Sequence, residues 1–227
     1  MLDARLSSAA KFVRQGAIFA DIGTDHAHLP LFLLSEGRIE RAVCSDINEG
    51  PLGSARQNAA AAGLSERIDF YLADGAQSLS GLGITDIAIC GMGGELISDI
   101  IDRAPWLRTS FVRLILQPMT RVGELRSYLA AAGFSVTAED YSSAQGKYYV
   151  TVVAEYTGER YTLTDTEVYL GMESVVAHKS AAYFGYLSSH ALACRRRIEG
   201  RRAGGRDTEC DEAILREIEK RLGENRQ

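Results

Sequence analysis

The chain has 227 residues, of which 46% are hydrophobic and 24% charged, and its net charge at pH 7 is −5. This composition is typical of a soluble α/β domain with an appendage, and it excludes a wholly basic nucleic-acid binder. No apolar run approaches the roughly 18–20 residues that a membrane helix needs, and Lys11 and Arg14 interrupt any signal-peptide core. The four cysteines lack zinc spacing. We therefore expect a cytoplasmic protein that does not span a membrane.

Short apolar runs alternate with helical patterns in the first two thirds of the chain, which predicts a mostly parallel sheet covered on both faces. The expected strands are 17–23, 41–47, 68–74, 85–90, 113–117, 134–141 and 148–155. The expected helices are 3–15, 26–37, 51–63, 94–103 and 121–132. The last two strands follow one another directly, so the segment between them should form a hairpin loop.

The pattern changes after Gly158, where strand signals stop. Thr164, with Glu167 three residues later, predicts the capped start of one long helix that runs to residue 202. A Gly-Gly pair then breaks the helix, and a shorter helix follows. Apolar residues recur at spacings of three, four or seven, so we expect a coiled-coil-like antiparallel hairpin. The expected domains are 1–157 and 158–227.

Three acidic residues, Asp21, Asp46 and Asp74, end three successive predicted strands. Because the carboxyl ends of parallel strands face one crevice, all three should line the same cleft. Each of them taken alone could instead be the N-cap of a helix. An acid after the second strand can accept both ribose hydroxyls, and one after the third can accept an adenine amine. Together they predict an adenosine-shaped ligand.

The segment "DIGTDHAHLP", residues 21–30, decides which adenosine ligand fits. A pyrophosphate requires several glycines and many free backbone N–H groups. This turn instead has one glycine and two acids, which suit the positive charges of S-adenosylmethionine (SAM). The expected cofactor-binding residues are Asp21, Gly23, Thr24, His26, Asp46, Ile47, Asp74, Gly75, Gly91 and Met92.

The two histidines of this segment, His26 and His28, raise the question of a metal site. Two residues apart on a helix, they should point away from each other, and no third ligand is spaced to join them. We therefore expect no metal. His26 should form hydrogen bonds at the start of the helix, and His28 should form a wall of the pocket.

Six segments taken together, "DIGTDHAHLP", "SDINEGPLGSA", "ADGA", "ICGMGGELI", "LILQP" and "GKYYVTVVAEY", resemble the bacterial tRNA methyltransferases that modify N1 of adenine 22. The resemblance implies a seven-stranded, Rossmann-like class I methyltransferase sheet, SAM as cofactor, tRNA as partner and a C-terminal helical hairpin. It also implies that the glycines around Gly93 face the methyl group and its acceptor. This chain has His28 where the family usually has tyrosine, and Met119 where it usually has asparagine.

The expected reaction is SAM-dependent methylation of adenine N1 in tRNA, with Asp25 nearest the reacting centre and His28 and Gly93 beside it. Adenine N1 already holds a lone pair, so positioning should contribute more than a general base. Two alternatives stay open. One is a SAM methyltransferase of another RNA or of a small molecule, and the other is a non-catalytic RNA-binding module with a vestigial SAM fold.

Charges are segregated in the C-terminal part. Residues 179–206 hold seven bases and one acid, whereas residues 207–224 hold seven acids and three bases. The bases could bind phosphates while aromatic residues stack on an exposed base, or they could pair with the acids across the hairpin. The expected RNA-binding residues of this monomeric protein are Lys179, Tyr186, His190, Arg197 and Arg201.

Overall fold

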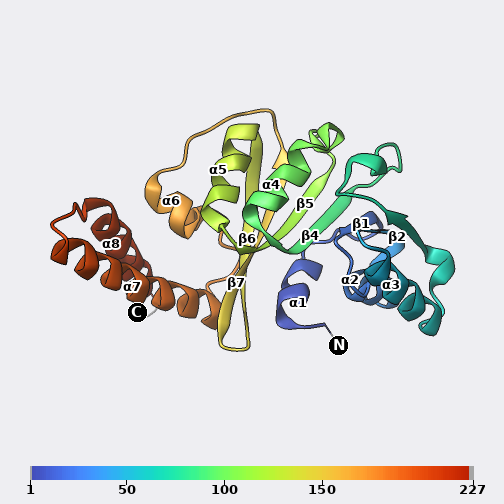
Figure 1. Ribbon diagram of the computed structural model, residues 1–227, viewed down its shortest axis with the longest axis horizontal. Coiled ribbons are helices and arrows are strands. Elements are labelled where there is room, and N and C mark those ends of the chain that lie inside the picture. The colour runs from blue at the N-terminus through green and yellow to red at the C-terminus, as the bar shows by residue number, and fades with distance from the viewer. Residues whose placement is uncertain (1, 225–227) are drawn as a thin grey trace.

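The computed structural model describes residues 2–224, and its centre is one seven-stranded sheet (Figure 1). The strand order is β3-β2-β1-β4-β5-β7-β6; β7 is antiparallel to both its neighbours, and the first five strands are parallel. The predicted plan of parallel units closed by an antiparallel hairpin is therefore confirmed. The strands are β1 (Ala17–Ile22), β2 (Ile39–Asp46), β3 (Ile68–Leu72), β4 (Asp86–Gly93), β5 (Arg113–Thr120), β6 (Phe134–Ala144) and β7 (Lys147–Tyr156).

Eight α-helices and four short 3₁₀ turns are described within residues 2–224. The helices are α1 (Ala4–Ala10), α2 (His28–Ser35), α3 (Glu49–Ala61), α4 (Gly94–Asp102), α5 (Val122–Ala132), α6 (Asp165–Leu170), α7 (Ala181–Ala203) and α8 (Glu209–Gly223). The 3₁₀ turns are Ser65–Arg67, Gln77–Leu79, Pro105–Leu107 and Glu173–Val175.

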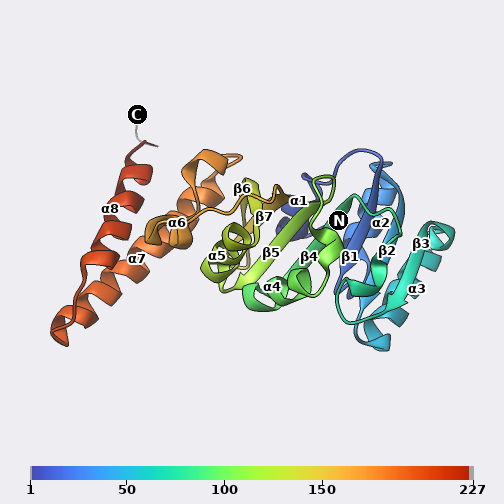
Figure 2. The same ribbon diagram turned by 90° about the horizontal axis from the view of Figure 1, so that it is seen from above.

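The two faces of the sheet bury two separate apolar clusters. In β1, Phe19 packs with α1, α2 and α3, whereas Ala20 and Ile22 pack on the side of α4 and α5. This alternation follows from the two-residue period of a strand. Figure 2 shows the helices on both sides of the twisted sheet. Because helices cover both faces of the sheet, we expect a ligand site at the edge where the parallel strands end.

The N-terminal helix is shorter than the predicted helix over residues 3–15. After Ala10 the chain turns, and both the backbone N–H and the guanidinium of Arg14 bond to the buried carboxylate of Asp86. On α1 itself, Ser8 donates to Asp140 Oδ2 at 2.9 Å, and Lys11 forms an ion pair with the same oxygen at 2.8 Å. These bonds attach the start of the chain to β6.

The prediction of a single long helix from Thr164 to residue 202 is wrong, although its capping box at Thr164 is present. The helix stops at Gly171, whose φ of 81° and ψ of 158° are not helical, and α7 begins only after Ser180. A Cβ on Gly171 would collide with the Glu139 carboxylate. The chain therefore bends against β6 here, and Val176 forms a β-bridge with Glu139. The antiparallel pair of helices that follows, α7 and α8, agrees with the prediction.

The sheet and the C-terminal part are joined by a buried ion pair. The guanidinium of Arg126 on α5 donates to both oxygens of Glu139 on β6, at 2.7 and 2.8 Å, and each residue is only 1% exposed. Arg126 also donates to the carbonyls of Val168 and Tyr169 on α6. Burial opposes the charge of Arg126, yet the adjacent Glu139 carboxylate raises the pKa of Arg126 above its ordinary value. The pair is charged, and it fixes α6 to the sheet.

Replacing Arg126 with methionine would leave the Glu139 carboxylate buried without its cation. We expect the free energy of unfolding to fall by about 3–5 kcal/mol, measured by urea denaturation. The double variant Arg126→Met/Glu139→Gln should recover part of this loss. As a matched control, Arg41→Ala removes an exposed ion pair with Asp69 and should change stability by less than about 1 kcal/mol. A single variant as stable as the control would contradict this role.

Candidate functional site

The acidic residues at the strand ends lie along one edge of the sheet, as predicted. Asp21 and Asp46 lie in the neighbouring strands β1 and β2, and Asp74 follows the end of β3. None of them is the N-cap of a helix: α2 and α3 begin after Ala27 and Asn48, without a side-chain cap. Their oxygens are therefore placed for other partners at this edge.

The first two backbone donors of the turn after β1 bond within the protein. Gly23 adopts a φ of 74°, and the N–H groups of Gly23 and Thr24 both donate to the carbonyl of Ser45, at 2.7 and 3.1 Å. A Cβ on Gly23 would also collide with the methyl group of Met92. Gly23 is thus needed for the left-handed turn, and its own N–H and that of Thr24 are not available to a phosphate.

Asp21 is a buried acid without a basic partner. Its residue is 8% exposed, Thr24 Oγ1 donates to it at 2.7 Å, and it forms no ion pair within residues 2–224. Burial raises the pKa of Asp21 to about 7, the Thr24 hydrogen bond works against this rise, and nearby Asp46 adds to it. A positively charged ligand would supply the missing counter-charge.

Beside Asp21, the ends of β2 and β3 combine an acid with exposed apolar side chains. One oxygen of Asp46 accepts the N–H of Asn48 at 2.8 Å. Ile47 is 62% exposed and Leu72 is 59% exposed. A carboxylate flanked by two such residues can accept ribose hydroxyls while a flat base lies against the apolar surface.

Asp74 is already occupied in this structure. Arg103 at the end of α4 donates to both of its oxygens, at 2.6 and 3.2 Å, and this hydrogen bonding lowers the pKa of Asp74. Gly75, which follows, has a φ of 78° and turns the chain back toward the sheet. An adenine amine would have to share Asp74 with Arg103, so a role for Asp74 in cofactor binding stays a prediction.

A cavity of about 310 Å³ brings together six of the predicted site residues: Asp21, Gly23, Asp25, His26, His28 and Gly91. Sequence reasoning missed its other walls, which come from α1 and from β5: Arg5 and Leu6 on one side and Gln117 on the other. Gln117 is fully buried, and its Oε1 accepts the N–H of Gly91 at 3.2 Å. No local pattern marks these residues, because only the packing of α1 against the sheet brings them to the cavity.

The expectation that His26 and His28 point apart is wrong. Ala27 between them has a φ of 54°, so the helix begins only at His28 and the two rings lie 5.3 Å apart. His26 Nε2 also approaches Asp25 at 3.5 Å, and its carbonyl accepts the amide of Asn58. Within residues 2–224, no three His, Cys, Asp or Glu side chains converge as metal ligands.

The glycines after β4 do not form an open platform. β4 continues through Met92 to Gly93, and a Cβ on Gly94 would collide with the backbone of Arg121 at the start of α5. Gly93 itself has ordinary β backbone angles as the N-cap of α4, and a Cβ there would lie 3.3 Å from Thr120 Oγ1. Gly94 is therefore required for helix packing, and an acceptor contact at Gly93 stays a prediction.

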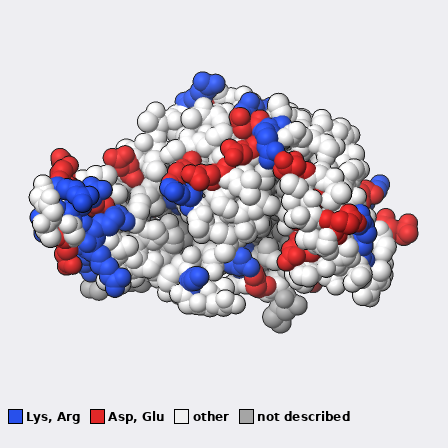
Figure 3. All heavy atoms as spheres, in the orientation of Figure 1, with Lys and Arg blue, Asp and Glu red and all other residues white. Residues whose placement is uncertain are grey.

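Most of the seven bases between residues 179 and 206 form ion pairs with acids, in agreement with the alternative that these charges pair within the C-terminal part. Arg197 and Arg201 both contact Asp211, at 2.9 and 3.1 Å, and Lys179 lies before α7, where it contacts Glu173 and Glu224. Figure 3 shows the positive side chains of this lobe interspersed with acidic ones. Within the described part of the chain, two of the seven bases form no ion pair: Arg196 and Arg206.

The two aromatic residues predicted to contact RNA do not lie on an open flank. Tyr186 is only 5% exposed and packs against Tyr141 of β6, and His190 lies against Tyr186 and Tyr169. The physical reason is that this side of α7 faces α6 and the β6–β7 hairpin rather than solvent. RNA binding by any of the five predicted residues stays a prediction.

None of the described helices is both long enough and apolar enough to cross a membrane.

The family described as "Methyltransferase domain" matches residues 2–152. The tRNA (adenine(22)-N(1))-methyltransferase of Bacillus subtilis is 33% identical over 154 residues, which span 68% of this chain and 65% of that protein. The alignment thus spans slightly less than two thirds of that relative.

Solved structures extend the similarity over nearly the whole chain. Streptococcus pneumoniae Sp1610, in complex with S-adenosyl-L-methionine, is 33% identical with a TM-score of 0.82, covering 98% of this chain and 100% of that one. The Bacillus subtilis m1A22 tRNA methyltransferase TrmK is 27% identical with a TM-score of 0.78, covering 98% and 96%. The chain belongs to the bacterial tRNA (adenine(22)-N(1))-methyltransferase family, within the methyltransferase-domain proteins.

Proposed function

We propose that this protein uses SAM to methylate N1 of an adenine in tRNA, at position 22 by analogy with its relatives. The observation that carries the proposal is Asp21, a buried carboxyl that forms no ion pair within residues 2–224 and lies at a turn with a single glycine. A phosphate-bearing cofactor would be repelled there, whereas a positively charged one would be attracted. Membership of a methyltransferase family supports the same cofactor.

The residues present fit SAM along the whole edge. Asp21 faces the charged amino-acid end in the 310 Å³ cavity, where Arg5 can pair with a carboxylate. Asp46 would accept ribose hydroxyls, and the exposed side chains of Ile47 and Leu72 would supply apolar contacts to the adenine. When bound, SAM supplies an electrophilic methyl group on a sulfonium centre.

The protein's part in the reaction is mainly to position the acceptor. Neutral adenine N1 attacks with its own lone pair, so no side chain has to remove a proton first. The product is a cation, and Asp25, a 74% exposed carboxylate in the cavity wall, can stabilise that charge. N1 is normally held in a base pair, so the target base must leave its stack before transfer.

The proposal is tested by incubating the purified protein with SAM and tRNA transcripts and mapping reverse-transcriptase stops, because N1 methylation blocks Watson–Crick pairing. A single stop that depends on both SAM and protein supports it. Methylation of small molecules alone, or SAM binding without any transfer, would overturn it. We also propose that the protein acts in the cytoplasm as a monomer, which sedimentation at assay concentrations checks.

Asp21 should make SAM binding depend on pH. A cation binds the ionised carboxyl, and the pKa of Asp21 in the free protein is about 7, so SAM affinity should rise up to about tenfold per pH unit between pH 5.5 and 7. Calorimetry over this range measures it, with Asp21→Asn expected to bind weakly and without this dependence. An equal pH dependence in both proteins would assign it to another group.

Ionisation of Asp21, which favours SAM binding, lowers the stability of the protein without SAM. Because its pKa is raised from 3.8, Asp21 supports folding at low pH, and this contribution is lost as the pH rises through about 7. Asp21→Asn should therefore melt at a higher temperature than the wild type at pH 8 without SAM, yet gain little when SAM is added. A variant that melts lower at pH 8 would contradict the raised pKa.

Asp46 and Asp25 should affect different steps. Asp46→Ala removes a charged hydrogen-bond acceptor and should weaken SAM binding by about 1.5–3 kcal/mol, measured by calorimetry. Asp25→Asn should instead lower kcat far more than SAM affinity. Asp69→Ala, an exposed acid on β3 paired with Arg41, is the matched control and should change neither. Equal losses of affinity in both variants would make Asp25 a cofactor ligand only.

Helix α7 carries arginines that form ion pairs and arginines that form none within residues 2–224. Arg197→Ala leaves Asp211, 4% exposed, without its closest cation and should lower the melting temperature. Arg196→Ala removes an exposed base that forms no ion pair within residues 2–224, so it should flatten the salt dependence of tRNA binding by about one unit without changing stability. An unchanged salt slope in Arg196→Ala would mean that this face of α7 does not contact RNA.

A further inference from the structure

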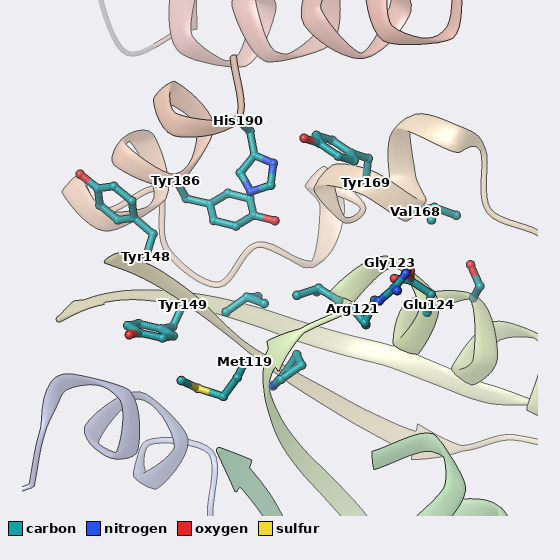
Figure 4. A pocket seen from close by; sticks show the side chains of 14 residues that line it. Met119, Arg121, Gly123, Glu124, Tyr148, Tyr149, Val168, Tyr169, Tyr186 and His190 are labelled. Atoms are coloured by element: carbon teal, nitrogen blue, oxygen red, sulfur yellow. The ribbon is translucent and has the colours of Figure 1, made fainter. Parts of the chain in front are cut away.

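A second and larger cavity lies between the sheet and the C-terminal helices (Figure 4). Its volume is about 850 Å³, within the roughly 300–1,000 Å³ typical of small-molecule sites. It is bounded by the end of β5, the start of α5, the tip of the β6–β7 hairpin, and α6 and α7. The protein thus has a site-sized space that the cofactor residues do not use.

Five of the fourteen residues that line this cavity are aromatic: Tyr148, Tyr149, Tyr169, Tyr186 and His190. Tyr148 and Tyr149 come from the start of β7, and Tyr186 and His190 come from α7, where their rings lie 4.1 Å apart. Burial, together with Arg126 and Arg197, lowers the pKa of His190 to about 4, so this ring is neutral at pH 7. Helix α7 can lie this close to the start of β7 because residue 185 is glycine; a Cβ there would collide with the Tyr148 ring.

The side chains of Met119, Arg5 and Gln117 lie between this cavity and the cofactor cavity. Met119 lines the large cavity, and its sulfur accepts hydrogen bonds from Arg5 at 3.5 Å and from Gln117 at 3.7 Å, both of which line the small one. The Arg5 guanidinium also lies 5.4 Å from the centroid of the Tyr149 ring. A group in the large cavity could therefore reach the cofactor edge past two flexible side chains.

We propose that the tyrosine-lined cavity receives the target adenosine extruded from the RNA, with its base stacked on Tyr149 and its N1 edge turned toward Met119. This inference rests on the proposed function and assigns the acceptor site, to which the C-terminal helix α7 contributes a wall. Met119 and Arg5 are positioning residues at the opening between acceptor and cofactor.

Three physical points carry the assignment. Enzymes that modify a base inside a paired structure hold it between aromatic or apolar side chains in a pocket, as this cavity offers. Stacking on a tyrosine repays part of the free energy lost when the base leaves its stack. The product is a flat cation, and the Tyr149 ring already accepts a flat cation in Arg5, whereas neutral His190 does not repel it.

The test compares Tyr149→Ala, Tyr149→Phe and, as a matched control, Phe111→Ala, an aromatic residue that is 61% exposed and does not line the cavity. The wild type first defines the methylated adenine. Tyr149→Ala should lower kcat/KM for tRNA roughly 10- to 100-fold, the range of base–aromatic stacking. SAM affinity and melting temperature should stay unchanged, Tyr149→Phe should retain most activity, and Phe111→Ala should match the wild type.

A second readout does not depend on catalysis. A tRNA transcript with 2-aminopurine at the methylated position should fluoresce more strongly when bound to Tyr149→Ala than to the wild type, because a stacked ring quenches the base. Wild-type kcat/KM and wild-type fluorescence in Tyr149→Ala would overturn the acceptor site while leaving the proposed function intact. Loss of SAM binding in that variant would also overturn it, whereas a wild type that methylates no tRNA overturns the proposed function itself.

Discussion

The buried ion pair between Arg126 and Glu139 is the interaction on which the arrangement of the C-terminal part depends. A charge pair in an apolar interior is stable only when all its hydrogen bonds are made, and here Tyr141 and two α6 carbonyls complete them. The pair therefore tolerates only one position of α6 relative to the sheet. The bend at Gly171 follows from the same contact, since no larger residue fits against Glu139.

The sheet edge shows how a fold shared by many nucleotide-binding proteins is specialised. The N–H groups of Gly23 and Thr24 donate to Ser45, and Asp21 is buried at the same turn, so the turn favours a positively charged ligand over a phosphate. In the free protein the ionised form of Asp21 is unfavourable, and either a proton or a positively charged ligand relieves it. Such a residue lowers stability in return for selectivity.

Most of the fold could be predicted from the sequence, because strand and helix patterns are local and the order of the units fixes the topology. The acids at the strand ends were predictable for the same reason. His26 and His28 were not, since their approach depends on the left-handed angle at Ala27. Arg5, Gln117 and Tyr149 carry no local signal, because packing between distant segments brings them to the cavities. The pairing of Arg197 with Asp211 was foreseen only as one of two alternatives.

The attachment of α1 has a consequence for the order of events during synthesis. Ser8 and Lys11 find their partner Asp140, and Ser8 also Thr151, only after nearly the whole sheet has been made. At roughly 5–20 residues per second, α1 waits about 7–30 s after its own synthesis for these partners. Arg5 and Leu6, which close the small cavity, are therefore fixed late. A nascent chain whose first five strands have formed can already pack α1 against α2 and β5. The polar bonds that fix α1 to the hairpin strands form only afterwards, so this wall of the small cavity is fixed in a late step.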